Sequence, residues 1–268
     1  MPTACGCLAP RLAKSTLDDL FVYYPLRYPL GEWHPAGLAF EDAWFTAADG
    51  TRLHGWYCPH PNPRAVVLVG HGNAGNLSYD ADTMRILQQQ LRVTAMIFDY
   101  RGFGRSKGVP NEHGVLADAR AARAWLAQRA NVAEDDIVLM GRSLGGGVMV
   151  DLAASYPPRA LVLVSTFTSL PDVAEHKLPH VPVRSVMHNR LDSLSKIGRY
   201  HGPLLQSHGE LDTLVPIEQA RRLFVAANEP KWFVTIPGAK HNWVPTLEYV
   251  AELDRFLGSL PEREGYRR

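Results

Sequence analysis

One serine of this chain stands in a pattern that can turn a hydroxyl group into a nucleophile. Residues 141–146 read Gly-Arg-Ser-Leu-Gly-Gly, and an apolar run at 137–140 precedes them. A serine on a tight turn between a strand and a helix takes a strained backbone conformation, which presents its hydroxyl to a reacting carbonyl. A chain with 22 glycines can also show G-x-S-x-G by chance. Its place between a strand-like and a helix-like run favours Ser143 as the nucleophile.

An acid and a histidine stand where such a serine would need them. A serine hydroxyl requires a base to accept its proton and a carboxylate to orient that base, and both are expected later in the chain. Asp212 lies after an apolar run at 204–206, and His241 lies after the next run at 232–236. Because the carboxyl ends of parallel strands share one edge of a sheet, we expect both side chains to meet the serine there. Glu210 is the alternative acid.

Two backbone N–H groups are candidates for stabilising the negative charge that develops on a carbonyl oxygen, where one donor is commonly worth about 10²–10³ in rate. The first belongs to Leu144, directly after the serine. The second is assigned to Asn73, with Ala74 as the alternative, in the loop 71–76 that follows an apolar run. This loop lacks the glycine and lysine spacing of nucleotide-binding motifs. We therefore expect His71 to be structural and to fix the loop.

The elements that must position these residues alternate along the chain. Short aliphatic runs followed by stretches of helical period predict an α/β fold, with a mainly parallel sheet and helices on both faces. The expected strands are residues 65–69, 95–98, 137–140, 161–164, 204–206 and 232–236. The expected helices are residues 79–91, 115–129, 143–155, 217–227 and 246–260. Runs at 38–46 and 53–57 flank the turn dipeptide Asp49-Gly50, so the sheet is expected to begin antiparallel.

Nothing in the composition divides the chain into two domains. We expect one α/β domain at 38–260, an extension at 1–37 that packs on it or flanks it, and a tail at 261–268. The interval 168–201 holds prolines and histidines but no clear strand, and it lies between two expected core strands. Because ligands bind beyond the carboxyl ends of such strands, this interval is interpreted as a small cap that shapes the substrate pocket. The alternative is a long loop with a helix near 191–197.

Charge argues against polyanionic partners. The formal net charge is +1 among 268 residues, and no long Lys/Arg run is present, which gives no electrostatic footprint for nucleic acid. We expect a small-molecule or lipid-like acyl substrate instead. Oligomeric state, acyl chain length and leaving group are not predicted by these patterns.

Cysteine usage and hydropathy bear on the compartment. Three cysteines are too few for a disulfide framework, which favours a reducing compartment, here the cytoplasm. Cys5 and Cys7 are expected to be free thiols, with lipidation or metal binding as alternatives. No uninterrupted apolar run of about 18–20 residues predicts a membrane span, and no signal peptide is expected. The amphipathic, aromatic residues 17–24 are expected to pack against the domain, with peripheral contact to a membrane as the alternative.

Five motifs together resemble a known superfamily. They are residues 71–76, 99–106, 141–146, 208–212 and 238–241. Over about residues 38–260 the chain is similar to the α/β-hydrolase superfamily, and within it to the α/β-hydrolase-domain-containing proteins that include animal protein depalmitoylases and related bacterial hydrolases. The resemblance implies the α/β-hydrolase fold, with an eight-stranded type of sheet, and hydrolysis of a carboxylic ester or thioester. It also implies that Asp99 is structural, because in the family's pattern this residue ends a strand and organises the turn after it.

The combined hypothesis is a serine hydrolase that needs neither metal nor cofactor. Ser143 would attack the acyl carbon, His241 would carry the proton, and Asp212 would orient His241. The N–H groups of Leu144 and Asn73 would stabilise the oxyanion. Two alternatives stay open: a peptidase acting on short peptides, and a catalytically silent binding protein on the hydrolase scaffold.

Overall fold

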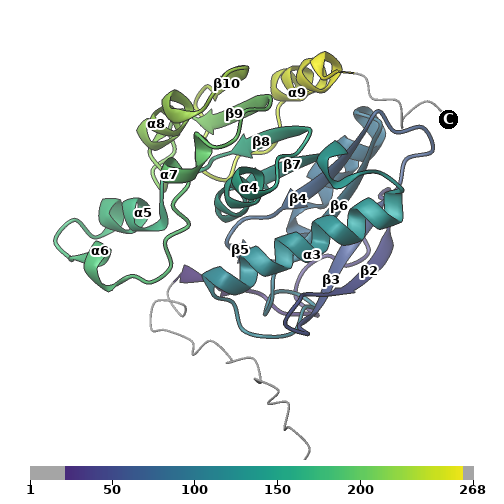
Figure 1. Cartoon of the computed structure of the whole chain (residues 1–268), viewed down its shortest axis with the longest axis horizontal. Coiled ribbons are helices and arrows are strands. Elements are labelled where there is room, and N and C mark those ends of the chain that lie inside the picture. The colour runs from purple at the N-terminus through teal and green to yellow at the C-terminus, as the bar shows by residue number, and fades with distance from the viewer. Residues whose placement is uncertain (1–21, 262–268) are drawn as a thin grey trace, which may run out of the picture.

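A computed structural model describes residues 22–261 and is built around one eight-stranded sheet (Figure 1). The strand order is β10-β9-β8-β7-β4-β6-β3-β2, and β3 alone runs opposite to its neighbours. The strands are β2 (Glu41–Thr46), β3 (Arg52–Cys58), β4 (Ala65–Gly70), β6 (Val93–Asp99), β7 (Ile137–Arg142), β8 (Ala160–Val164), β9 (Leu204–Gly209) and β10 (Lys231–Ile236). This is the α/β-hydrolase fold, with the expected antiparallel start.

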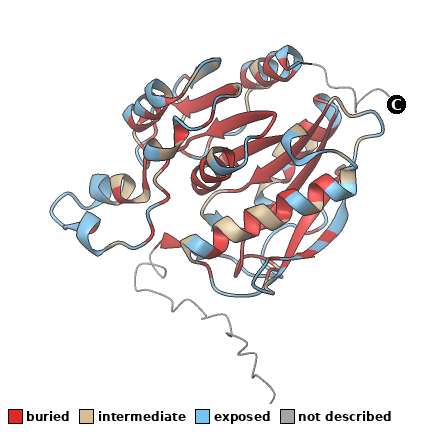
Figure 2. Cartoon of the chain, in the orientation of Figure 1, coloured by how far each residue is buried: buried red, intermediate tan, exposed pale blue. Residues whose placement is uncertain are grey.

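The central strands form because nearly every side chain in them is apolar and can be buried. All residues of β4, β6 and β8 are buried, as parallel strands covered on both faces require (Figure 2). Successive side chains point to opposite faces, so Leu68 joins one apolar core while Val67 and Val69 join the other. The edge strand β2 instead alternates between buried and exposed residues.

Helices cover both faces of the sheet. The longer ones are α3 (Glu112–Ala130), α4 (Leu144–Ser155), α8 (Ile217–Ala226) and α9 (Leu247–Ser259), and the shorter ones are α2 (Ala81–Arg85), α5 (Leu170–Lys177), α6 (Val183–Val186) and α7 (Leu194–Ile197). The apolar sides of α3 and α4 belong to one core, and those of α2 and α9 belong to the other. Each layer of helices thus shields one face from water.

The single helix expected at 79–91 is wrong in detail. The structure divides this stretch into a 3₁₀ turn at Leu77–Asp80, the helix α2 and a wider π-type turn at Ile86–Gln90. The wider turn coincides with the buried side chain of Gln88, whose amide donates hydrogen bonds of 2.7 and 2.9 Å to two carbonyl groups of the chain before β4. The periodicity of apolar residues does not predict these partners, because they are backbone groups far away in the sequence.

Two segments flank the sheet near its carboxyl ends. A short strand β1 (Tyr24–Pro25) pairs in parallel with β5 (Ala74–Gly75), a contact that the sequence patterns do not predict. Residues 168–201 connect β8 to β9 and contain α5, α6 and α7, with α5 and α6 projecting from the body of the molecule in Figure 1. Whether this segment acts as a cap stays a prediction at this stage.

The predictions for the two ends of the chain can be compared with the structure only in part. Cys5, Cys7, residues 17–21 and the tail beyond 261 lie outside the described residues. In the described part of the aromatic N-terminal stretch, Val22 and Tyr23 are buried against the domain. Between residues 22 and 261, no helix has the length and apolar character to cross a bilayer.

Candidate active site

Ser143 lies on a strained turn between β7 and α4. Its φ of 51° and ψ of −112° place a non-glycine residue in a region that costs about 1–3 kcal/mol. The surrounding backbone holds it there, since the Ser143 N–H donates to the carbonyl of Val164 at 2.8 Å. A Cβ on Gly141 would lie 2.3 Å from the carbonyl oxygen of Gly145, and one on Gly145 would lie 2.0 Å from that of Gly70. The two glycines therefore permit the close approach that the G-x-S-x-G pattern predicts.

The structure brings the three side chains of the expected triad into one hydrogen-bonded chain. Ser143 Oγ lies 3.0 Å from His241 Nε2, and His241 Nδ1 lies 2.7 Å from Asp212 Oδ2. The other carboxylate oxygen accepts the backbone N–H groups of Leu214 and Val215, each at 2.9 Å. Because carboxylates only accept, Nδ1 of the histidine carries its proton towards Asp212 and leaves Nε2 free to take the serine proton. This is the geometry required to activate a serine hydroxyl.

Asp212 remains ionised although it is buried. Burial raises the pKa of its carboxyl, but hydrogen bonds from His208 and His241 and from the Val215 N–H outweigh it, and the pKa lies well below its usual range. His208 Nε2 lies 3.1 Å from Asp212 Oδ2 and 2.8 Å from the Val215 carbonyl oxygen. The alternative acid Glu210 accepts a hydrogen bond from a loop N–H on the surface instead. The ionised carboxylate next to His241 therefore belongs to Asp212.

His208 is a member of the site that the sequence reasoning missed. Its side chain is fully buried and reaches Asp212 from four positions earlier in the chain, at the end of β9. The Val215 carbonyl oxygen and the Asp212 carboxylate are both acceptors, so His208 Nε2 must carry a proton and donate it to them. The only signal in the sequence is the His-Gly-x-x-Asp spacing itself, which becomes informative once a strand is known to end there.

The loop that carries His241 is anchored by Arg142, the residue before Ser143. Arg142 donates to the backbone carbonyl groups of His241 at 3.3 Å and Trp243 at 3.0 Å. The Trp243 indole N–H donates to Ser165 Oγ at 3.1 Å, and that hydroxyl lies 3.3 Å from the carbonyl oxygen of His241. These contacts fix the histidine backbone relative to β7 and β8. Nothing in the sequence patterns singled out Arg142, because its partners lie about a hundred positions away.

Both expected oxyanion donors lie beside the serine. Leu144 is the first residue of α4, where backbone N–H groups have no partner within the helix. Leu144 and Asn73 line the same cavity as Ser143, whereas Ala74 does not. The Asn73 side chain donates to the backbone carbonyl of Val22, which ties its loop to the N-terminal segment. The placement therefore favours Asn73 over Ala74 for the second donor.

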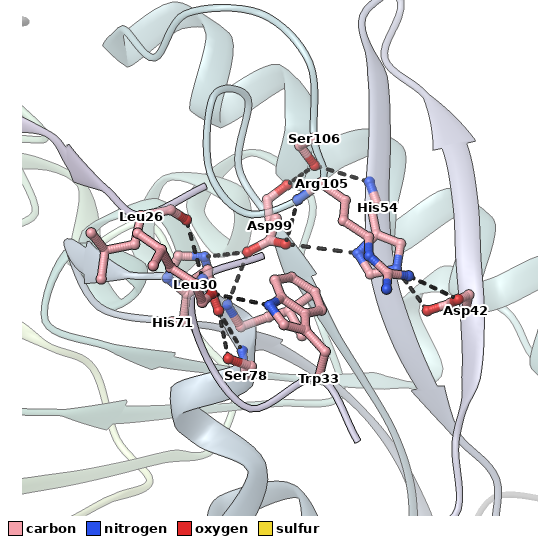
Figure 3. A network of polar contacts seen from close by, with 12 residues as sticks. Leu26, Leu30, Trp33, Asp42, His54, His71, Ser78, Asp99, Arg105 and Ser106 are labelled. Carbon is pink, nitrogen blue, oxygen red and sulfur yellow. Dashed lines mark hydrogen bonds and ion pairs between the residues drawn. The ribbon is translucent and has the colours of Figure 1, made fainter. Parts of the chain in front are cut away.

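Asp99 organises the base of this loop and lies between His71 and His54 in a network of polar contacts (Figure 3). Its buried carboxylate accepts the backbone N–H of Leu77 at 2.9 Å and lies 3.7 Å from both His71 Nε2 and His54 Nδ1. His71 Nδ1 lies 2.7 Å from the carbonyl oxygen of Gly72, so it carries a proton and fixes the ring. Asp99 and His71 thus support the loop that carries Asn73, and His54 extends this network towards the edge of the sheet.

Loss of the Asp99 carboxylate is expected to destabilise the fold. Asp99→Ala leaves the buried N–H of Leu77 without its acceptor and removes the carboxylate that two buried histidines face, so we expect the free energy of unfolding to fall by about 1–3 kcal/mol. Urea denaturation measures this change. The matched control is Asp254→Ala, which removes a half-exposed ion pair with Arg64 and should cost less than about 1 kcal/mol. Equal effects of the two variants would contradict the structural role of Asp99.

A large cavity opens from the triad towards α5 and α6. Its volume is about 910 Å³, and Ser143, Leu144 and Asn73 are among the residues that line it. Other walls come from α5, from α6 and from Leu214 and Val215, which follow Asp212. Among residues 22–261, no group of three or more His, Cys, Asp or Glu side chains is placed to hold a metal ion.

Comparisons with known proteins agree with this architecture. A family model described as serine aminopeptidase, S33, matches residues 61–194. An uncharacterized protein of Mycobacterium tuberculosis is 39% identical over 241 residues, which cover 88% of this chain and 85% of that protein. The α/β-hydrolase domain-containing protein WAV2 of Arabidopsis thaliana is 32% identical over 249 residues, covering 84% of this chain and 81% of WAV2. A solved esterase of Pyrococcus furiosus matches with a TM-score of 0.73 at 21% identity and covers 89% of this chain and 98% of its own.

Proposed function

The chain belongs to the α/β-hydrolase superfamily, in the family described as serine aminopeptidase, S33, and from this premise we propose that it is a serine hydrolase of carboxylic esters or thioesters. One observation carries the proposal: Ser143, His241 and the ionised Asp212 form a continuous hydrogen-bonded chain that ends in a large cavity. The esterase activity named for the Pyrococcus furiosus neighbour supports the same reaction class.

The proposed reaction passes through an acyl-enzyme. His241 Nε2 accepts the proton of Ser143 Oγ while that oxygen bonds to the carbonyl carbon of the substrate. The resulting oxyanion accepts hydrogen bonds from the N–H groups of Leu144 and Asn73. Collapse breaks the bond to the alcohol or thiol, which leaves with the proton from His241. Water then gives its proton to His241 and attacks the acyl group, and the acid is released with Ser143 restored.

Trapping the intermediate tests this proposal. Rapid acid quenching of the protein during turnover of p-nitrophenyl acetate is expected to leave one acetyl group on the peptide that contains Ser143. Mass spectrometry of the digested protein measures the modification and its site. Turnover with no acylation of that peptide, or with acylation of another residue, would contradict the mechanism. No turnover of any ester or thioester would favour the catalytically silent binding protein.

Peptidase activity is the second candidate, and the matched family's description gives it weight. An aminopeptidase needs an acidic group to bind the free ammonium group of its substrate, and an ammonium group without a charged partner is costly to bury. Among the described residues that line the cavity there is no Asp or Glu, and the charged one is Lys177. We therefore expect p-nitrophenyl esters to be cleaved with a higher kcat/KM than aminoacyl p-nitroanilides. The reverse preference would favour the peptidase.

The compartment and the membrane contact also remain proposals. We propose a cytoplasmic protein, in keeping with Cys58, which is buried and whose burial raises the pKa of its thiol to about 12.

The described part of the N-terminal aromatic stretch is partly buried and partly exposed. Val22 and Tyr23 are buried, while Tyr24 is 57% exposed. Sedimentation of the full chain with anionic lipid vesicles tests peripheral contact through this stretch, with a variant that starts at residue 22 as the control.

A further inference from the structure

The cavity beside Ser143 extends far beyond the space that the reacting groups need. We propose that it is a binding site for a long, unbranched acyl chain, so that the substrate is an ester or thioester of a fatty acid. This inference rests on the proposed function, because reaction at Ser143 defines where the carbonyl end of the chain lies.

The size of the cavity sets the length of chain that fits. Its volume is about 910 Å³. A water molecule occupies about 30 Å³ of the liquid, and a methylene group is of similar size. The cavity therefore has room for a chain of a dozen carbons or more, and an acetyl group would leave most of it filled with water.

The walls of the cavity are apolar where the chain would lie. From α5 they include Leu170, Val173 and Ala174, and from α6 they include Val183 and Val186. A sugar acid or a hydroxylated aromatic acid would bury hydroxyl groups against these walls without partners, at a cost of about 1–3 kcal/mol for each group. An alkyl chain has no polar group to lose. The chemistry of the walls thus selects a hydrocarbon.

Few of the side chains that line this cavity are charged or ionisable. Lys177 and His188 line the cavity but are exposed. The Lys177 ammonium group donates to the backbone carbonyl of Thr213 at 3.0 Å, which holds it against the loop that follows Asp212. The reacting carbonyl would lie beside Ser143, and the apolar residues of α5 and α6 would contact the methylene groups.

The rim of the cavity exposes apolar side chains that a bound chain would cover. Leu178, Val181 and Val186 are 52%, 46% and 59% exposed, although all three line the cavity. Neighbouring apolar side chains that face solvent around a hollow commonly mark a binding surface. Removing their surface from water favours a longer chain over a shorter one.

A series of soluble esters tests the inference in the wild-type protein. We expect kcat/KM for p-nitrophenyl acetate, butanoate, hexanoate and octanoate to rise about threefold to fourfold for each added methylene, as full burial of each group predicts. All substrates are used below their critical micelle concentrations. A kcat/KM that is flat or that falls beyond butanoate would overturn the proposal, even if acetate is hydrolysed rapidly.

A bulky side chain in the wall should shorten the preferred chain. Ala174→Phe fills the cavity from α5, so we expect the ratio of kcat/KM for octanoate to that for acetate to fall at least tenfold. The matched control is His176→Phe, which places the same ring on the same helix at an exposed residue outside the cavity lining. Circular dichroism and thermal denaturation report whether each variant is folded. Retention of the octanoate preference in Ala174→Phe would contradict the assignment of this wall.

Binding without turnover separates this inference from the proposed reaction. In Ser143→Ala we expect a fluorescent fatty acid to bind, and dodecanoate to displace it far better than butanoate does. Such binding in a protein whose wild type hydrolyses no ester would refute the reaction and retain the chain site. Ester hydrolysis by the wild type with no chain-length-dependent displacement would refute the chain site and retain the reaction.

Discussion

Replacement of Ser143 by alanine is expected to lower kcat for p-nitrophenyl esters by about 10⁴-fold to 10⁶-fold, because it removes the hydroxyl group that forms the proposed acyl-enzyme. Covalent labelling by a fluorophosphonate should be lost with it. The structure makes this prediction specific, since the Oγ that would react lies 3.0 Å from His241 Nε2 and lines the cavity. The residual rate reports what the oxyanion donors and substrate binding contribute without a nucleophile.

The control for this variant is another buried serine close to the site. Ser207 lies in β9, and its hydroxyl contacts the backbone carbonyl of Leu163 at 3.3 Å instead of the triad. Ser207→Ala should keep kcat within a few-fold of the wild type and should still be labelled. If Ser143→Ala were labelled by the fluorophosphonate, or hydrolysed esters at the rate of Ser207→Ala, the nucleophile would have to be another residue.

The sheet could be predicted from the sequence because its signal is local. In β4, β7 and β8 nearly every residue is apolar, and each run is short and followed by a turn. Each strand can therefore be recognised from its own residues, without knowing which strands pair with it. The same locality places Ser143, Asp212 and His241 at strand ends. Once the strands are parallel, their carboxyl ends share one edge, and the meeting of the three side chains follows from topology.

The supporting contacts could not be predicted, because each depends on a partner that is distant in the chain. Arg142 meets the carbonyl of His241 across 99 positions. The Asp99 carboxylate accepts the N–H of Leu77, which lies 22 positions earlier in the chain. His54 lies near Asp99 from the antiparallel part of the sheet. A sequence pattern identifies a buried polar residue only through its neighbours along the chain. Which group satisfies it is decided by the packing of the helices and loops.

Asp212→Asn is expected to lower kcat by about 10⁴-fold while KM changes little. Asparagine has the shape of aspartate, so its amide oxygen can still accept the N–H groups of Leu214 and Val215. Its NH₂ group, however, faces His241 Nδ1 as a donor and stabilises the tautomer that carries the proton on Nε2. In that tautomer Nε2 cannot accept the serine proton. Steady-state kinetics with p-nitrophenyl butanoate measures the loss, and Glu210→Gln, two residues earlier, is the matched control that should leave kcat nearly unchanged.

The lowered pKa of Asp212 adds a second readout of the same substitution. The pKa of the Asp212 carboxyl is lower in the folded protein than in the unfolded protein, where it lies near the reference value of 3.8. Such a carboxyl stabilises the fold fully at a pH above its unfolded pKa. This stabilisation is lost as the pH falls through the folded pKa. The wild type should therefore exceed Asp212→Asn in free energy of unfolding at pH 7, and the difference should shrink towards pH 3. Urea denaturation at both pH values measures it. A difference that does not depend on pH would mean that Asp212 is not held ionised by His208 and His241, and the orienting role assigned to it would fail with that result.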